Sequence, residues 1–291
     1  MDPVKARQHR AEPMICEYST RDAIIFALGV GATVKTDLHF LYENHDNFQV
    51  FPTFAINAGL RGNRLGDTPG VDFKLEHVLH GEQYIELLEP FPDEGELRVE
   101  SNVLDILDKG NSAVILGNVE LYNNKNNRKI ANLQISTFQV GSGGFNGPRS
   151  NPGEIKAVPV PQRSPDHVAE EPTSPNQAAL YRLGSMDLNP LHIDAAFAKM
   201  GGFKTPILHG MCTLGVSVRA VLRDFGNNDA RNFKAVKARF SAPVLPGQTL
   251  QVEMWRGDNN RVHFQTKVKE TGKVVIASSY VDFHKVNTPK L

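Results

Sequence analysis

The sequence predicts an α+β protein in which two similar halves each place an antiparallel sheet against a helix. Three observations support this prediction: a helical pattern followed by strand-like runs fills the second half, similar segments fill the first half in the same order, and a stretch rich in Gly, Pro and Ser separates the two. The 291 residues correspond to about two domains, at roughly 150 residues per domain.

The second half contains the clearest helix, which is expected over residues 206–226. Apolar residues recur there at helical spacing, a proline stands near the start and a glycine closes the segment. Runs of alternating apolar and polar residues follow at 233–245, 249–268 and 273–283, with the turns GDNN and ETGK. A helix followed by an antiparallel meander predicts one helix packed on one sheet.

The first half is similar, but its helix is weaker. Strands are expected at 96–107, 112–123 and 129–140, and the helix at 53–63 is shorter and interrupted by glycine. This half therefore resembles a degenerate copy of the second half.

Segments of the two halves can be aligned directly. Residues 19–32 match 174–187, which places Phe26 on Tyr181 and Gly29 on Gly184. In the same comparison 51–56 match 205–210, and 79–87 match 245–253. We expect an N-terminal unit at 14–145, a linker at 146–173, a C-terminal unit at 174–286 and a tail at 287–291. The linker is expected because its Gly, Pro and Ser content and lack of apolar periodicity do not support a packed core.

Composition and charge exclude several classes of protein. Lys plus Arg and Asp plus Glu each number 32, so the net charge is zero and nothing favours a nucleic-acid partner. No run approaches the ~20 apolar residues of a membrane span, and the start lacks the apolar region of a signal peptide. The two cysteines cannot form a disulfide framework. A soluble intracellular protein is expected.

The segment most able to carry chemistry is Asp187–His192, with the sequence DLNPLH. Asn189 and Pro190 favour a turn between the carboxylate and the imidazole, so both side chains can face one water molecule for acid–base chemistry. The spacing alone is also compatible with, and slightly favours, a helix cap beside a hydrogen-bonded histidine.

A second candidate is Gly210, near the start of the expected helix at 206–226. Backbone N–H groups in a first helical turn lack partners and can stabilise a developing oxyanion, although a glycine there can also serve close packing. The basic residues of the strand at 233–245 can contact phosphates or form a solvated face. The histidines make no HExxH or Cys/His cluster, so no metal site is expected.

The segments YRLGSMDLNPLHID and PILHG, together with VLHGEQY, LDKG, QVGSGGF and KARFSAPVLPGQTL, resemble the (R)-specific enoyl-CoA hydratase 2 family, which is MaoC-like. The resemblance runs nearly end to end. It implies a double hot dog fold, in which each half is a helix wrapped by an antiparallel sheet, a continuous sheet shared by the halves, and a homodimer. It implies hydration of trans-2-enoyl-CoA to (R)-3-hydroxyacyl-CoA in fatty acid β-oxidation, with no cofactor.

The resemblance also implies roles for individual residues. Asp187 and His192 become the catalytic acid–base pair, the Gly210 N–H becomes the oxyanion donor, and Glu43 of the degenerate half becomes an essential glutamate. The substrate-binding residues implied are His80, Gly81, Lys109, Asn189 and Phe240. Ala32 aligns with Asp187, so one site per chain is expected and the first half is free to hold the acyl chain.

One departure from the family concerns the turn before Asp187. The family reads YRLSGD, whereas this chain reads YRLGSMD, one residue longer with Met186 before the aspartate. We expect the loop to absorb the extra residue as a bulge and to leave Asp187 and His192 converging.

Two other functions remain open from the sequence. A hot dog acyl-CoA thioesterase would release free thiol, and a non-catalytic acyl-CoA binding protein would bind without turnover. The ending Thr288–Leu291 resembles a peroxisomal signal in its final Lys-Leu, which with the family resemblance favours the peroxisome over the cytoplasm.

Overall fold

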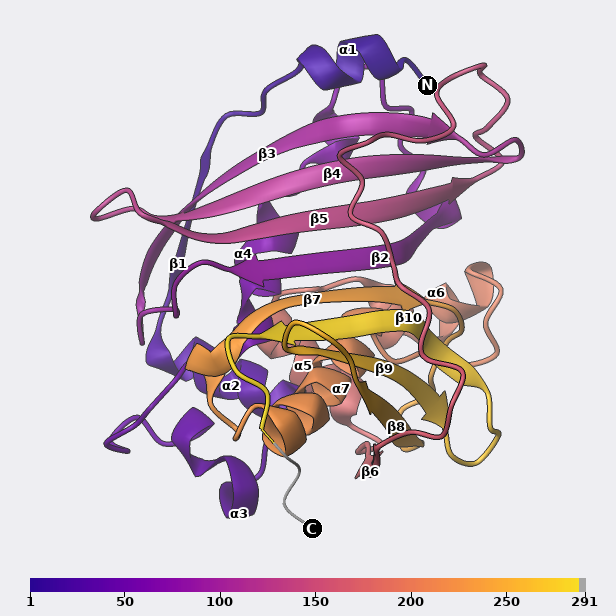
Figure 1. Ribbon diagram of the computed structural model, residues 1–291. Helices are drawn as coiled ribbons and strands as arrows, with labels where there is room; N and C mark the ends of the chain where they lie inside the picture. The colour runs from indigo at the N-terminus through magenta and orange to yellow at the C-terminus, as the bar shows by residue number, and fades with distance from the viewer. Residues whose placement is uncertain (288–291) are drawn as a thin grey trace.

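Ten antiparallel strands form one continuous sheet in the computed structural model, which describes residues 1–287 (Figure 1). The strand order is β1-β3-β4-β5-β2-β7-β10-β9-β8-β6. The strands are β1 (Met14–Tyr18), β2 (Val78–Leu87), β3 (Gly95–Asp108), β4 (Ser112–Asn123), β5 (Lys129–Val140), β6 (His167–Pro172), β7 (Phe233–Phe240), β8 (Thr249–Arg256), β9 (Arg261–Val268) and β10 (Val274–Phe283). The predicted α+β class and the double hot dog expectation are confirmed.

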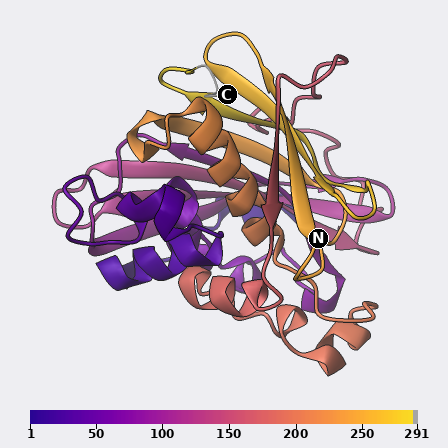
Figure 2. The same cartoon turned by 90° about the horizontal axis from the view of Figure 1, so that it is seen from below.

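The helices are α1 (Pro3–Gln8), α2 (Thr20–Gly29), α3 (Val34–Asp37), α4 (Ala55–Gly62), α5 (Gln177–Ser185), α6 (Ala195–Met200) and α7 (Gly210–Phe225). Helix α4 packs on β1, β3, β4 and β5, and α7 packs on β6 to β10, so each half has its own helix against its own strands (Figure 2). Every residue of α7 from Met211 to Leu222 is buried. The weak helix predicted at 53–63 is α4, and the strong one at 206–226 is α7. Within the described residues, no helix is both long and apolar enough to cross a membrane.

The two halves join where β2 pairs with β7, from Glu82↔Arg239 to Glu86↔Ala235. The strand order on the two sides of this joint makes β2 the counterpart of β7, and β3 the counterpart of β8. The alignment of 79–87 with 245–253 was therefore wrong. Both segments alternate apolar and polar residues, and that period does not identify which strand of a sheet a segment forms.

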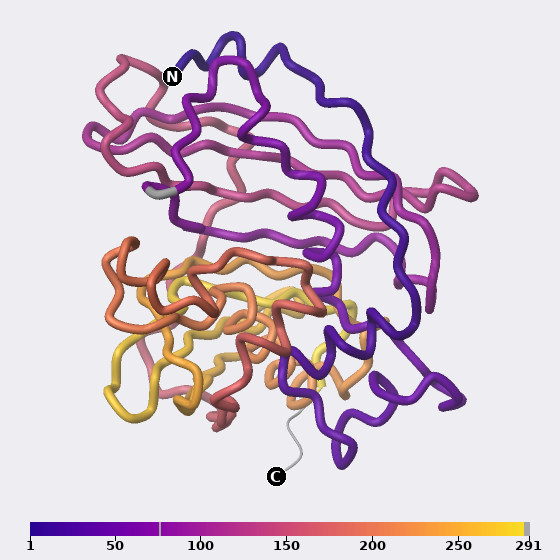
Figure 3. The backbone as a smooth tube through the Cα atoms, turned by 180° about the vertical axis from the view of Figure 1, so that it is seen from behind, coloured from indigo at the N-terminus to yellow at the C-terminus, as the bar shows by residue number. Residues whose placement is uncertain are grey.

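The alignment of 19–32 with 174–187 is confirmed, because these segments form α2 and α5, which pack against each other. A Cβ atom on Gly29 would lie 2.9 Å from the Tyr181 Cα, and one on Gly184 would lie 2.5 Å from the Phe26 Cα. Each glycine therefore lets the aligned aromatic residue of the other helix come close. Figure 3 follows the chain from the N-terminus beside β3 down to α2, which lies next to the second half.

The expected linker at 146–173 is more ordered than its composition predicts. It runs over the sheet between the halves (Figure 1) and ends in β6, an edge strand that pairs with β8 along its length. Gln134 of β5 donates to the Gly153 carbonyl and accepts from the Ile155 N–H, and the Val158 N–H donates to the Ser278 carbonyl. Glycine- and proline-rich chain can be fixed in this way because side chains of the sheet satisfy its backbone groups.

Lys237 corrects the expectation of a solvated face on β7. Its side chain is fully buried, and its Nζ lies 2.8 Å from Glu82 Oε2 across the joint between the halves. Glu82 Oε1 also accepts from the Arg239 guanidinium at 2.7 Å. The basic residues of this strand therefore serve the joint, except for the exposed Lys234.

We expect Gly184→Ala to lower the free energy of unfolding by about 1–3 kcal/mol, because the new methyl group would meet the backbone of Phe26 rather than a movable side chain. Urea unfolding measures this change. Leu183→Ala, at an exposed position of the same helix, is the matched control and should change stability by less than about 0.5 kcal/mol. Equal effects of the two substitutions would contradict the close crossing.

Candidate active site

The end of α5 delivers Asp187. The helix stops at Met186, which has φ 59° and ψ 18°, a left-handed conformation that a helix commonly uses to terminate. Ser185 Oγ donates to the Tyr181 carbonyl and accepts from the Asp187 N–H at 3.2 Å. The extra residue before Asp187 is thus accommodated at the end of the helix, by one left-handed residue.

Asn189 shapes the turn between the two catalytic candidates. Its N–H donates to Asp187 Oδ1 at 3.2 Å, and its own Oδ1 accepts from the Leu191 N–H at 3.0 Å. It thereby caps the short 3-10 helix η5 (Pro190–His192). The side-chain oxygen of Asn189 has a structural partner, so this residue supports the geometry of the Asp187–His192 pair.

His192 presents a fixed tautomer. Its Nδ1 lies 2.8 Å from the Ile207 carbonyl oxygen, which can only accept, so Nδ1 carries the hydrogen and Nε2 carries a lone pair. The residue is 9% exposed, and burial lowers the pKa of the imidazole below its ordinary value, while Asp187 opposes the shift. His192 is therefore neutral near pH 7 and able to accept a proton.

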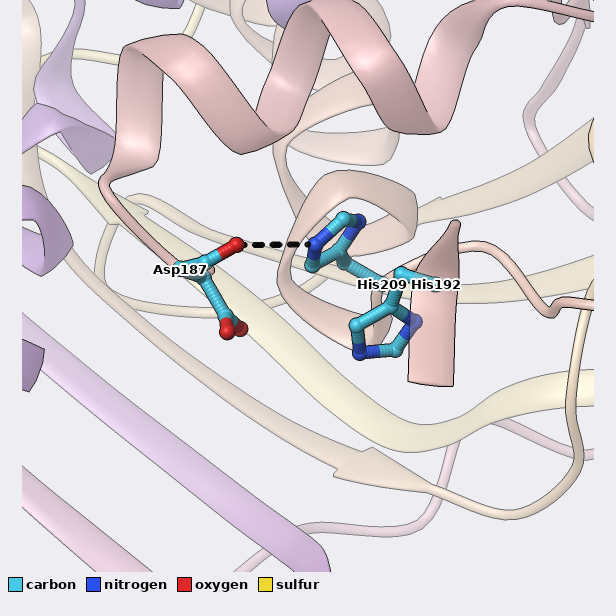
Figure 4. Close-up of side chains that lie close together, drawn as sticks. All are labelled: Asp187, His192 and His209. Atoms are coloured by element: carbon cyan, nitrogen blue, oxygen red, sulfur yellow. Dashed lines mark hydrogen bonds between the residues drawn. The ribbon is translucent and has the colours of Figure 1, made fainter. Parts of the chain in front are cut away.

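A second histidine joins the pair. His209 stacks on His192 with ring centroids 3.7 Å apart and planes inclined by 27°, and its Nε2 lies 3.4 Å from the Asp187 carbonyl oxygen (Figure 4). One possible ligand atom from each of Asp187, His192 and His209 lies within 4.8 Å of the others. The predicted convergence of Asp187 and His192 thus occurs, with a third side chain beside it.

These three side chains are a possible cation site by residue type. One cation would need the lone pairs of both imidazoles to converge, but the lone pairs lie in ring planes that are stacked 3.7 Å apart and inclined by only 27°. His209 Nε2 also faces a carbonyl oxygen, which requires it to donate. The arrangement fits proton transfer better than metal binding.

Gly210 is the first residue of α7, directly after His209. Its N–H belongs to the first helical turn, whose N–H groups have no partner within the helix and lie at the positive end of the helix dipole. The Phe240 ring lies against this glycine, since a Cβ there would be 3.3 Å from Phe240 Cδ1. The start of α7 therefore offers an N–H group that can act as an oxyanion donor, next to the histidine that stacks on His192.

His80 and Gly81 reach the same place through a bulge in β2. The register with β5 shifts between His80 and Glu82, and a Cβ on Gly81 would lie 2.3 Å from the Phe138 ring. The bulge puts His80 on the same face as Gln83, whose Oε1 lies 3.0 Å from His80 Nε2. The His80 ring meets the Phe240 ring edge to face at 5.2 Å. His80, Gly81 and Phe240 thus line the approach to Gly210.

Lys109 and Glu43 are not brought to the pair. Lys109 lies on the exposed turn between β3 and β4, two to three strand spacings or about 10–14 Å from β2 across the sheet, where its Nζ donates to the Arg149 carbonyl. This position suits only a remote part of an extended substrate.

Glu43 is exposed in the loop after His39, whose ring contacts the Asn228 carbonyl at 2.7 Å. Asn228 follows the C-terminal end of α7, and a helix of 16 residues is about 24 Å long. Within this chain Glu43 therefore lies near the opposite end of α7 from Gly210, and it does not contact the reacting groups.

The sequence reasoning missed the side chains that support the pair. His209 directly precedes Gly210, but its stack on His192 depends on a segment 17 positions earlier in the chain. Gln83 was hidden because a residue three positions from His80 faces the other side of a regular strand. The sequence held one signal for the bulge: the segment VLHGEQY has a glycine inside a strand pattern, directly after the histidine.

Comparison with known proteins agrees with this geometry. The MFE-2 hydratase 2 N-terminal domain model matches residues 16–141, and the MaoC like domain model matches residues 156–279. A crystal structure of a MaoC-like dehydratase from Phytophthora capsici is 33% identical, with a TM-score of 0.87, over 97% of this chain and 98% of that chain. The fold and the site together define a MaoC-like double hot dog protein.

Two curated relatives are more specific. Enoyl-CoA hydratase 2, peroxisomal, from Arabidopsis thaliana is 41% identical over 91% of this chain and 90% of that protein. Peroxisomal multifunctional enzyme type 2 from Mus musculus is 50% identical over 96% of this chain, which spans 38% of that longer protein. The chain belongs to the enoyl-CoA hydratase 2 family of MaoC-like proteins.

We expect acid to destabilise the fold through its neutral buried histidines. Burial lowers the pKa of His80 to about 4 and lowers those of His192 and His209 as well, whereas the unfolded chain protonates near pH ~6.5. A lowered folded pKa means that the full stability is present above pH ~6.5 and is lost as the pH falls toward the folded value. Each histidine removes at most about 1.4 kcal/mol per pH unit in that window.

Urea unfolding at pH 7.5, 6 and 5 measures this loss. A free energy of unfolding that stays constant from pH 7.5 to 5 would contradict the neutral state of these histidines.

Proposed function

We propose that the chain hydrates trans-2-enoyl-CoA to (R)-3-hydroxyacyl-CoA in fatty acid β-oxidation. The observation that carries this proposal is the meeting of Asp187 and His192 beside the N–H of Gly210 at the start of α7. Hydration needs an acid–base pair and an oxyanion donor, and one chain contains residues for both. Addition of water moves no electrons between molecules, so the reaction requires no cofactor.

The thioester carbonyl of the substrate binds the Gly210 N–H. As the water oxygen attacks C3, negative charge moves to the carbonyl oxygen, where an oriented backbone donor stabilises the enolate-like transition state. Phe240 and His80 flank this position and shape the entrance for the acyl thioester. The glycine at 210 allows the close approach.

The water lies between the Asp187 carboxylate and His192 Nε2. His192 accepts the proton of the water through its lone pair, while the Nδ1–H remains bonded to the Ile207 carbonyl. Asp187 orients the same water and passes the proton that His192 accepted on to C2, so that His192 is neutral again at the end of the reaction. Because both groups approach from one side, the hydroxyl and the proton add to the same face of the double bond.

Two other functions are weaker. A thioesterase would direct its water at C1 and would also use an oxyanion donor, but two proton-transfer groups beside one water are what addition across C2 and C3 requires. A binding protein would not need His192 held in one tautomer. Free thiol release selects the first of these functions, and tight binding without turnover selects the second.

We propose a peroxisomal location for this chain. The peroxisomal names of the Arabidopsis and mouse proteins support this proposal. The suggested signal at Thr288–Leu291 lies outside the described residues. We also propose that the chain forms a homodimer, which sedimentation of the purified protein tests.

Asp187→Asn and His192→Gln should each fold normally and lower kcat for enoyl-CoA hydration by roughly 10²–10⁴, the usual contribution of one acid–base group. Because the two share one water, the double variant should lose far less than the product of the single losses. Loss of enoyl absorbance and chiral analysis of the product measure the reaction, and a thiol reagent tests for hydrolysis. More than a tenth of wild-type kcat in either single variant would rule out the assigned pair.

The pH dependence of kcat/KM should show an acid limb whose midpoint lies below ~6.5. His192 must be neutral to accept a proton, and burial lowers its pKa, so activity persists to a lower pH than an ordinary imidazole would allow. Initial rates from pH 4.5 to 8 at low substrate measure the midpoint. A midpoint above 7 would mean that another group is the base.

A further inference from the structure

We propose that His209 is a positioning residue for the acid–base pair: its ring holds both the Asp187 backbone and the plane of the His192 ring. The inference rests on the proposed hydration and deepens it. His209 touches neither substrate nor reacting water in this scheme, and it acts through the two residues that do.

The first argument is the hydrogen bond to Asp187. His209 Nε2 faces the Asp187 carbonyl oxygen at 3.4 Å (Figure 4), and a carbonyl only accepts, so Nε2 carries the hydrogen. Ser185 Oγ already holds the Asp187 N–H, and the Asn189 N–H holds the Asp187 carboxylate. His209 adds a third contact, at the Asp187 carbonyl, and ties this residue to the start of α7.

The second argument is the stack. The His192 ring is held at one edge by the Ile207 carbonyl and on one face by the His209 ring, 3.7 Å away. The hydrogen bond at one edge alone would let the His192 ring rotate about that bond. The stacked His209 ring prevents this rotation. The two contacts together direct His192 Nε2 toward Asp187.

The third argument is that His209 is itself fixed. It is 1% exposed, it is the residue before the first turn of α7, and its carbonyl accepts from the Thr213 N–H at 3.1 Å. The Tyr181 ring packs against it with centroids 5.0 Å apart. A side chain anchored to the buried helix can hold others in place because it cannot itself move.

The charges around His209 keep it neutral. The titratable groups that face it are His192, the charged Arg182, Asp187 and Tyr181. Burial lowers its pKa furthest, and a charge on His192 or Arg182 opposes protonation, while the Asp187 carbonyl favours it. A neutral Nε2–H tautomer leaves Nδ1 with a lone pair, which agrees with its lack of a partner among the described residues.

Two substitutions separate the two contacts. His209→Phe keeps an aromatic face against His192 but cannot donate to Asp187, and His209→Gln keeps an N–H near the Nε2 position but removes the stack. We expect His209→Phe to lower kcat by about tenfold to hundredfold with KM within about threefold, because the acid–base geometry and not substrate binding is disturbed.

His209→Gln should move the acid limb of kcat/KM upward by at least half a pH unit, because His192 loses an apolar face and becomes easier to protonate. A merely structural role for His209 would lower the amount of folded protein without moving this limb. His263→Phe is the matched control. This histidine of β9 also has a buried Nδ1 that finds no partner within residues 1–287, and its replacement should leave kcat and the pH profile unchanged.

A measurement on the wild-type chain does not depend on the folding of any variant. Nitrogen-15 NMR of labelled histidines should find His209 neutral from pH 5 to 8 with the hydrogen on Nε2, and His192 with the hydrogen on Nδ1 when neutral. The opposite tautomer, or protonation of His209 in this range, would overturn the proposal.

The outcomes distinguish this inference from the proposed function. If Asp187→Asn and His192→Gln keep full activity, the proposed function fails. If those variants are inactive while both His209 variants keep kcat within twofold and the wild-type acid limb, only the role of His209 fails.

Discussion

The pairing of β2 with β7 is the contact on which the rest of the molecule depends. It converts two sheets into one, and it places the bulge at Gly81 beside the end of β7, where Phe240 closes on the start of α7. A buried ion pair, Lys237 with Glu82, lies across this joint. Breaking one partner of a buried pair leaves an uncompensated charge, which is far more destabilising than the pair is stabilising. Loss of either partner alone would therefore weaken the joint.

Local patterns in the sequence predicted the elements of this fold well. Alternation identified β3, β4 and β5 of the first half and β7 to β10 of the second, but not β1, β2 or β6. Helical periodicity identified the helix that begins at Gly210. Patterns of period two could not identify which strand pairs with which, so one of the three aligned segments was wrong. The Gly- and Pro-rich stretch does connect the halves, but composition did not predict β6 at its end or its contacts with side chains of distant strands such as Gln134.

The site was predictable to the extent that it is local. Asp187, Asn189 and His192 lie within six residues, and a turn brings them together whatever the rest of the chain does. His209 and Gln83 act only through tertiary contacts, so no spacing in the sequence identified them. Glu43 is the opposite case. The family resemblance implied a catalytic role for it beside Asp187 and His192, but the fold puts it near the other end of α7.

The crossing of α2 and α5 has a consequence for how such a chain diverges. Gly29 contacts Tyr181, and its aligned counterpart Gly184 contacts Phe26, the residue aligned with Tyr181. The two helices therefore make the same contact in both directions, as at the isologous interface of a symmetric dimer. In a true homodimer one mutation alters both sides of such an interface at once. Here the two sides are encoded separately within one chain. One half can therefore keep Asp187 while the aligned position of the other half, Ala32, has no carboxylate. Because both halves are encoded in one gene, the two different halves are always inherited together.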